Sequence, residues 1–389
     1  MKRLFIEPLD VLMFRSERPF IARESHVAKL GVISPLTFEG AIKSKIFLDF
    51  CNKKSYLASD FQRKKNENES KFKKRVKNML EKDGELKEIL KVIGHPIISS
   101  TSSIRVLGVF FSEKDKKEEC FPIPNDIVRR DIQDDEILKL NPILEQELRI
   151  PNTENYVCFS VCSKIKGIKG LMSFNALKEY LWGGKPDKSQ MMEDPYETEV
   201  RTGIRLEKGV KTTIEGHIYT AEFLRLKENW GFIVWVEEDH GILNKYLDEN
   251  EIIKLGGEGK GALCMKINEI DIADKLEFPE LVEKINKEKR FKLYLASPSY
   301  FNGHKPPRDK LEKELKVKEL KLRTALPGKP VYIGGYDFAM NMEKPLRRWV
   351  NAGAVYYYEF SGEIKNDVSL PIKIIDENVD MRCAFIGRW

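Results

Sequence analysis

The chain has 389 residues, of which 41% are hydrophobic and 33% charged, and it carries a formal net charge of +6. This length exceeds one small domain and predicts two, each with a core of its own. The small positive charge is compatible with an RNA partner but does not by itself indicate one. No apolar stretch approaches the length of a membrane span, which excludes a helical membrane protein.

The N-terminus and the cysteines predict where the protein resides. Glu7, Pro8 and Asp10 interrupt the first apolar run, so we expect no signal peptide. The six cysteines are scattered, and Cys158 and Cys162 share a strand-like face with no histidine nearby. Reduced, buried thiols in a cytoplasmic protein fit this pattern better than a zinc site. We expect no metal and no cofactor.

The first strong structural signals are a strand and a helix. Residues 3–14 are typical of a strand in which Pro8 indicates an edge or a bulge. Ser34 at the N-cap and Pro35 at the first helical position predict a helix that runs to Phe50. Its apolar stripe is formed by Phe38, Ile42, Ile46 and Phe50.

Cations gather before this helix and on it. An irregular stretch from Arg15 to Ile33 precedes the helix. Inside the helix, Gly40 costs about 1 kcal/mol relative to alanine, so a nucleic-acid backbone or a partner protein could approach it closely. A tolerated surface glycine is the competing interpretation. The candidate RNA contacts in this part of the chain are Arg15, Arg18, Arg23, His26, Gly40, Lys43 and Lys45.

The rest of the first half alternates polar segments with strands. Residues 62–91 are dense in Lys, Asn and Glu, and we expect an exposed, partly helical insertion outside the core. Strands are predicted at 104–111 and 155–163, and a helix at 173–182 that Ser173 caps. The order strand, helix, strand, strand, helix is most of a βαββαβ ferredoxin-like unit, the arrangement of an RNA-recognition domain.

The second half shows strands more clearly than helices. Residues 196–211 form a basic hairpin or an inter-domain connection, and 216–226 and 230–237 predict a strand pair around Asn229. A glycine-rich turn leads into a strand within 255–267. The remaining elements are a helix at 278–289, a strand at 291–301 and a Lys/Glu-rich segment at 305–323. Candidate RNA contacts here are Arg201, Arg205, Gly256, Gly257, Gly259 and Lys260.

The stretch from Val331 to Phe360 combines glycines, cations and aromatic residues. Strands are predicted at Val331–Ile333 and Ala354–Phe360, joined by a connection that is not a tight hairpin. Glycine lets another chain approach the backbone, arginine matches phosphate geometry, and Trp349 and Tyr336 offer faces for an unpaired base. A solvated loop with Trp349 in the core is an equal alternative. The candidates are Gly334, Gly335, Lys344, Arg347, Arg348, Trp349 and Gly353.

Taken together, these stretches resemble the RAMP superfamily of CRISPR RNA-binding proteins. Within it, the chain is similar to the family that forms subunit three of the Cmr complex, the type III-B effector. The resemblance covers most of the chain, in family order. It is carried by FIEPLDVLMFRSERPF (5–20), SPLTFEGAIKSKI (34–46), FPIPNDIV (121–128), GHIYTAEFLRL (216–226), LGGEGKGA (255–262) and IGGYDFAMNMEKPLRRWVNAGAVYYYEF (333–360).

The resemblance implies an α+β fold of two tandem ferredoxin-like domains, which we place at 1–210 and 211–389. It also implies a non-catalytic subunit that binds the 5′ tag of the guide RNA. Such a subunit docks to the large cyclase/polymerase-like subunit and to a neighbouring backbone subunit. The sequence departs from the family at Asn351, where proline is expected, and at Asn341 and Met342, where more glycine is expected.

Two other functions stay open. Related RAMP nucleases use a histidine near the first strand–helix junction, where His26 and Lys29 lie, so a metal-independent guide-RNA endoribonuclease is the alternative. No second acid or base stands out, which favours the non-catalytic interpretation. A pure protein–protein adaptor is the third class, and the cations clustered near glycines argue mildly against it.

Overall fold

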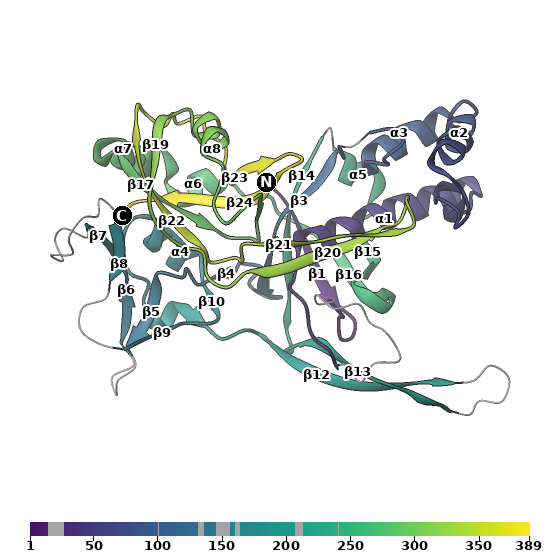
Figure 1. Cartoon of the computed structure of the whole chain (residues 1–389), viewed down its shortest axis with the longest axis horizontal. Coiled ribbons are helices and arrows are strands. Elements are labelled where there is room, and N and C mark those ends of the chain that lie inside the picture. The colour runs from purple at the N-terminus through teal and green to yellow at the C-terminus, as the bar shows by residue number, and fades with distance from the viewer. Residues whose placement is uncertain are drawn as a thin grey trace. The chain divides into compact units, whose positions relative to one another are not determined.

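The computed structural model describes the chain except for residues 15–26, 100, 131–135, 145–155, 160–163, 207–212 and 240. The fold is mixed α/β, with eight α-helices among the described residues and several antiparallel sheets (Figure 1). No described helix is both long and apolar enough to span a bilayer. The helices are α1 (Pro35–Lys54), α2 (Glu69–Leu80), α3 (Gly84–Ile93), α4 (Phe174–Leu181), α5 (Ile242–Tyr246), α6 (Ile272–Leu276), α7 (Phe278–Glu288) and α8 (Arg308–Leu315).

The chain forms two compact units, and each unit is assembled from three separate stretches. Unit 1 contains Met1–Val109, Tyr196–Glu269 and Tyr332–Arg347. Unit 2 contains Phe110–Pro195, Ile270–Val331 and Arg348–Trp389. Because the two units alternate along the chain, they do not coincide with the predicted domains 1–210 and 211–389.

A five-stranded sheet forms the centre of unit 1. The strand order is β15-β16-β1-β14-β3, with β1 antiparallel to both β14 and β16. The central strand β1 ends at Pro8, so the predicted strand over 3–14 is too long by six residues. The bounds are β1 (Lys2–Pro8), β3 (Ile104–Glu113), β14 (Trp230–Glu238), β15 (Asn250–Leu255) and β16 (Lys260–Ile267).

Helix α1 packs on this sheet, as its sequence predicts. The Ser34 side chain accepts a hydrogen bond from the Leu36 N–H at 3.3 Å, and the predicted apolar stripe is buried. The Phe38 ring meets Phe232 of β14 edge-on, with ring centroids 5.2 Å apart. The helix continues one turn beyond Phe50 and ends where Ser55 adopts a left-handed conformation.

The segment 62–91 is helical, but it is part of the core, and the expectation of a purely exposed insertion is wrong. Helices α2 and α3 each carry an apolar stripe among their charges, and α3 packs against α1. The polar composition concealed the stripe because the buried residues are few and spaced by helical turns. Its fully buried members are Phe72, Val76, Leu86, Ile89 and Leu90.

A long antiparallel hairpin of β12 (Tyr196–Leu206) and β13 (Thr213–Leu226) also belongs to unit 1. The predicted pairing of 216–226 with 230–237 is wrong, because β13 pairs with β12 whereas β14 pairs with β1. Asn229, with φ 64°, does turn the chain between β13 and β14. Each strand then joins a different sheet, and β2 (Val27–Ala28) lies parallel to β13.

The main sheet of unit 2 has the order β18-β24-β17-β22-β19, with β23 on β24. Its strands β24-β17-β22-β19 repeat the order of β16-β1-β14-β3, in which the first strand lies between the fourth and the third. The bounds in this sheet are β17 (Arg290–Leu295), β18 (Tyr300–Phe301), β19 (Lys318–Leu326), β22 (Val355–Ser361), β23 (Ile372–Ile375) and β24 (Val379–Gly387). Shorter strands are β4 (Phe121–Pro122), β5 (Ile127–Arg130), β6 (Ile137–Lys139), β7 (Asn141–Leu144), β8 (Tyr156–Phe159), β9 (Ile165–Gly167), β10 (Leu171–Met172) and β11 (Met191–Met192).

Most of the connection between 331 and 353 is a β-hairpin, which corrects the expected loop. Strands β20 (Val331–Asp337) and β21 (Met342–Trp349) form a separate two-stranded sheet, called the β20–β21 ribbon below. The turn between them uses Asn341 at φ 53°, a conformation that asparagine tolerates. The first seven residues of β21 are exposed, so the ribbon presents both of its faces to solvent along this strand.

Candidate nucleic-acid interface

The N-terminal candidates are only partly placed. Arg15, Arg18, Arg23 and His26 lie outside the described residues. Lys29 is exposed, and the N–H of the next residue, Leu30, donates to the Glu222 carboxylate at 2.9 Å. The proposed RNA contacts of this stretch therefore stay predictions.

On α1, the candidate lysines are engaged by carboxylates. Lys43 pairs with Glu39, whose other oxygen accepts from the Val106 N–H at 3.0 Å. Lys45 pairs with Asp49 and with Glu251 of β15, and these bonds raise the pKa of Lys45 although partial burial acts to lower it. Gly40 is exposed, and nothing lies within 4 Å of an added Cβ. The chain's own packing therefore gives no reason for a glycine at this position.

Three cations from separate segments meet around one carboxylate at the end of β1. Arg201 of β12, Arg225 of β13 and Lys260 of β16 lie 3.4, 3.5 and 3.9 Å from Asp10. Glu199 also pairs with both arginines. A hydrogen bond from the Val11 N–H, together with Arg201, holds the pKa of Asp10 below its usual range. The sequence predicts Arg201 and Lys260 as RNA contacts, whereas Arg225 and Asp10 emerge only from the structure.

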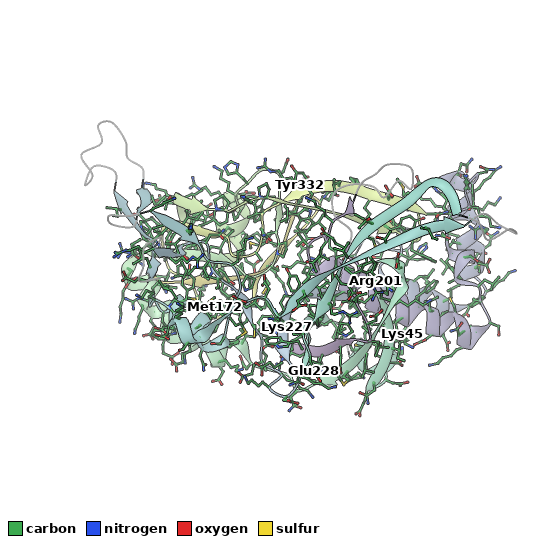
Figure 2. The ribbon with its side chains drawn as sticks, turned by 90° about the horizontal axis from the view of Figure 1, so that it is seen from below. Lys45, Met172, Arg201, Lys227, Glu228 and Tyr332 are labelled. Atoms are coloured by element: carbon green, nitrogen blue, oxygen red, sulfur yellow. The ribbon has the colours of Figure 1, made fainter. Side chains whose placement is uncertain are left out.

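An aromatic ring supports the same cluster. The Arg201 guanidinium and the Lys260 ammonium lie 5.2 and 5.5 Å from the centroid of Phe223. Figure 2 labels Arg201 on the hairpin of β12 and β13. Phe223 and Arg225 share one face of β13 through strand alternation, and this signal in the sequence could have identified Arg225. For Arg205 the backbone is described within β12, but its side chain lies outside the described part.

The glycines between β15 and β16 serve the chain's own packing. A Cβ on Gly256, which has φ 74°, would lie 2.6 Å from the Met13 carbonyl oxygen, and the Gly257 N–H donates to that oxygen at 2.7 Å. Gly259, with φ 58°, relieves backbone strain in the same turn. At Gly256 and Gly257 the closely approaching backbone is therefore that of Met13, not a ligand.

The β20–β21 ribbon keeps its predicted cations on the surface. Lys344, Arg347 and Arg348 are all exposed. A Cβ on Gly334 would lie 3.4 Å from Cδ1 of Leu346, so Gly334 leaves room for that side chain across the ribbon. Because residues alternate along a strand, Lys344 and Arg348 share the face of β21 that carries Leu346.

Aromatic and apolar side chains are exposed beside these cations. Tyr332 and Tyr336 lie on one face of β20 and are 38% and 54% exposed, and Tyr332 is labelled in Figure 2. Met342 and Leu346 of β21 are about half exposed. Large apolar groups seldom remain exposed together without a binding role, which makes this ribbon the strongest candidate interface in the described part of the chain.

Two predicted contacts at the base of the ribbon are internal. Trp349 is 6% exposed and packs against Tyr300, so its ring offers no face to a base in this structure. A Cβ on Gly353, with φ 89°, would lie 2.8 Å from the Ile123 carbonyl oxygen. The Gly353 N–H donates to the Leu295 oxygen, and its carbonyl accepts from the Asn125 N–H, both at 2.8 Å. These residues belong to the packing of unit 2.

The tip of the ribbon is anchored on unit 1. The Arg63 N–H donates to the Ala339 oxygen at 2.8 Å, and the Asn341 side chain donates to the Arg63 oxygen at 3.1 Å. The Gln62 side chain adds a bond to Asn341 at 3.2 Å. Asn341, which stands where the resemblance leads us to expect glycine, thus fixes the tip in place.

Other site chemistry is sparse in the described residues. They contain no group of three His, Cys, Asp or Glu side chains that could hold a metal ion. Cys51, Cys120, Cys264 and Cys383 are buried free thiols, and burial raises the pKa of each.

Comparison with known proteins gives one family and several solved structures. The model of the family described as CRISPR-associated protein (Cas_Cmr3) matches residues 4–373. No curated protein matches the chain.

Three solved structures illustrate the structural similarity. A chain of the type III-B Cmr-beta complex bound to cognate target RNA and AMPPnP has TM-score 0.46 and 16% identity, covering 91% of this chain and 86% of that chain. A chain of the type III-B Cmr-beta complex bound to cognate target RNA has TM-score 0.44 and 15% identity, covering 91% of this chain and 86% of that chain. A chain of the Csm3–Csm4 subcomplex of the type III-A CRISPR-Cas interference complex has TM-score 0.36 and 12% identity, covering 100% of this chain and 99% of that chain. All three TM-scores lie below 0.5, so the family assignment rests on the family model.

Proposed function

The chain belongs to the Cas_Cmr3 family of CRISPR-associated proteins and is a structural subunit of the type III-B Cmr effector; from this premise we propose that it holds the 5′ tag of the guide RNA. It also docks the large cyclase/polymerase-like subunit and a neighbouring RAMP subunit. The two repeated strand orders support two ferredoxin-like domains as the scaffold. The protein works without catalysis of its own and resides in the cytoplasm.

The observation that carries RNA binding is the exposed face of the β20–β21 ribbon. Tyr332 and Tyr336 offer rings on which unpaired bases stack, Lys344 and Arg348 offer charge to the phosphates between them, and Arg347 adds charge from the opposite face of β21. The anchored tip orders the ribbon before RNA arrives, which lowers the entropy cost of binding. A strand of RNA that bears the 5′ tag is the ligand that this combination fits.

Two kinds of variant separate the contribution of charge to RNA binding from that of base stacking. Arg347→Gln with Arg348→Gln should weaken binding of a tag-bearing RNA and make the salt dependence shallower by about 1.4, at about 0.7 per lost phosphate contact. Tyr336→Ala should weaken binding by about 1–3 kcal/mol through lost stacking, with an unchanged salt slope. Affinity is measured by fluorescence anisotropy at several salt concentrations.

Lys305→Gln with Lys313→Gln is the matched control, because both lysines are exposed and form no ion pair among the described residues. This control removes the same charge and should leave affinity near the wild-type value. If the arginine pair retains wild-type affinity and slope while folded, the ribbon does not hold the RNA.

A further inference from the structure

A large share of the chain's positive charge is concentrated in one short segment. Residues 62–81 contain eight Lys or Arg and three Glu, a net charge of +5, whereas the whole chain carries +6. The Lys/Glu-rich segment around α8 is basic as well, but there Arg308, Lys310 and Lys316 all form ion pairs. On α2, only Lys73 and Arg75 of the five cations form ion pairs among the described residues.

The helix that carries this charge is rigidly held. Phe72 and Val76 are fully buried beneath α2. The Arg75 guanidinium donates two hydrogen bonds to the Glu67 carboxylate, at 2.9 and 2.8 Å, and one to the Gln62 oxygen at 2.9 Å. Arg75 therefore serves the fold, and α2 is an ordered platform for the remaining cations.

Three lysines of α2 are exposed to solvent. Lys71, Lys74 and Lys77 are exposed and form no ion pair within the described part of the chain, whereas Lys73 pairs with Glu69. They are three residues apart, so each is displaced by about 4.5 Å along the helix axis from the last. We call Lys71, Lys74 and Lys77 the lysine face.

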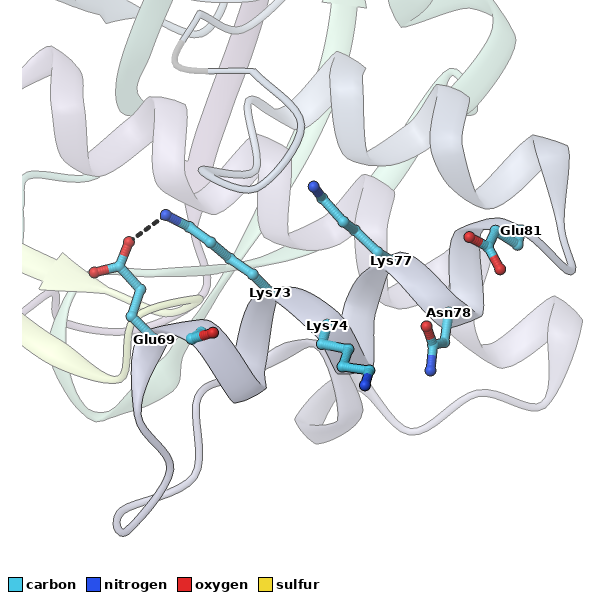
Figure 3. A pocket seen from close by; sticks show the side chains of 7 residues that line it. Glu69, Lys73, Lys74, Lys77, Asn78 and Glu81 are labelled. Atoms are coloured by element: carbon cyan, nitrogen blue, oxygen red, sulfur yellow. Dashed lines mark ion pairs between the residues drawn. The ribbon is translucent and has the colours of Figure 1, made fainter.

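Two members of the lysine face border an open hollow of about 690 Å³ (Figure 3). Its lining also includes Lys73 and the amide side chain of Asn78, and Glu69 and Glu81 lie at its two ends. Figure 3 shows Lys77 extending in the same direction as Lys73 and Lys74 pointing to another side of the helix, with the single ion pair drawn between Lys73 and Glu69. An extended anionic chain could lie along this surface and meet several ammonium groups.

Helix α2, which carries the lysine face, is linked to the tip of the β20–β21 ribbon through Gln62, within unit 1. The Gln62 side chain bonds to Asn341 at the ribbon tip, and the Gln62 carbonyl accepts from Arg75 of α2. Asn341 of the ribbon tip and Arg75 of α2 therefore both hydrogen-bond to Gln62. This chain of contacts makes α2 the helix toward which an RNA strand leaving the ribbon tip would continue.

We propose that the lysine face binds the phosphate backbone of single-stranded RNA that continues beyond the nucleotides held by the β20–β21 ribbon. This inference rests on the proposed function, because the ribbon supplies the first part of the path. Lysine ammonium groups act on phosphates as point charges and release condensed counterions without reading sequence. The contact extends the RNA-binding surface and leaves recognition of the tag to the ribbon.

The test compares RNA length with the number of lysines removed. Lys71→Gln, Lys74→Gln and Lys77→Gln together should leave a short tag RNA bound normally and weaken a several-fold longer one. For the long RNA, the salt slope should become shallower by about 2, so the advantage of wild type should shrink roughly twenty-fold between 50 and 200 mM salt.

A matched control is available next to the lysine face. Lys82, Lys87 and Lys91 are also exposed and form no ion pair among the described residues, but three carboxylates, Asp83, Glu85 and Glu88, lie among them. Their triple Gln variant removes the same charge and should change neither affinity nor slope. Both variants are first checked for cooperative melting at the wild-type temperature.

Three outcomes would overturn the inference, each in a different way. Wild-type affinity and slope for the long RNA in the Lys71 triple variant would show that the lysine face is only solvated. Equal losses in both triple variants would indicate a general effect of net charge. Competition by polyglutamate at matched charge would indicate an acidic protein partner. Loss of short RNA binding in the ribbon variants alone tests the proposed function separately.

Discussion

His95 is a buried histidine whose two ring nitrogens are assigned by their partners. The Ile97 N–H donates to Nδ1 at 3.4 Å, so Nδ1 is unprotonated, and Nε2–H then donates to the Phe61 oxygen at 3.1 Å. The ring also packs against Phe72 of α2. Burial lowers the pKa of His95 from its ordinary value of 6.5, although the bond to Phe61 acts to raise it. The neutral imidazole therefore links Phe72 of α2 to Phe61, which lies just before the segment 62–91.

This histidine predicts a loss of stability in mild acid. The unfolded chain protonates His95 near its ordinary pKa of 6.5 while the folded chain does not, so stability falls as the pH drops through that value. The cost is at most about 1.4 kcal/mol for each pH unit below it. Urea unfolding at pH 7.5 and pH 5.5 measures the difference, which His95→Gln should reduce. A pH dependence identical to that of wild type in this variant would contradict the assignment.

Glycines show what a single sequence leaves open at the residue scale. The sequence correctly marks Gly256 and Gly353 as places of close approach, and both have positive φ. It does not reveal what approaches, and the structure finds the carbonyls of Met13 and Ile123 there. The same residue type serves a ligand or the chain's own backbone, and only tertiary contacts decide between them.

Local signals predict elements better than they predict partners. Helix α1 was readable because a cap, an N1 proline and an apolar stripe agree along one stretch. The sequence does not predict that β13 pairs with β12 and not with β14, because a short turn at Asn229 fits a hairpin as well as a change of sheet. Register and partner depend on distant residues, which a local pattern does not contain.

The expectation that α2 and α3 lie outside the core is wrong for a related reason, because their charged residues outnumber the apolar residues of the stripe. Leu90 of α3 is fully buried, so Leu90→Ala should cost about 2–5 kcal/mol of the free energy of unfolding. Leu57→Ala is the control, because Leu57 is 67% exposed and its loss should change stability by less than about 0.5 kcal/mol. Denaturant unfolding measures both, and a tolerated Leu90→Ala would return 62–91 to the status of a detachable insertion.

At the scale of the whole molecule, the proposed function includes a protein partner that no spacing in the sequence reveals. We expect the large cyclase-like subunit, co-expressed from the same operon, to co-elute with this protein at moderate salt. The Arg347 and Arg348 double variant should co-elute equally well, because the proposed role of the ribbon is toward RNA.

Two results would change this assignment. Failure of two folded proteins to co-elute would count against the proposed docking. Loss of the partner in the double variant, with normal RNA affinity, would reassign the ribbon from RNA to protein.

The alternation of the two units along the chain has a consequence for synthesis on the ribosome. Strand β1 is complete at Pro8, but its neighbours β14 and β16 end at Glu238 and Ile267. At about 5–20 residues per second, β1 waits roughly 13–50 s for its second neighbour to be translated. Until β14 is complete its apolar residues have no neighbouring strand to pair with, so the nascent chain is a natural client for ribosome-associated chaperones.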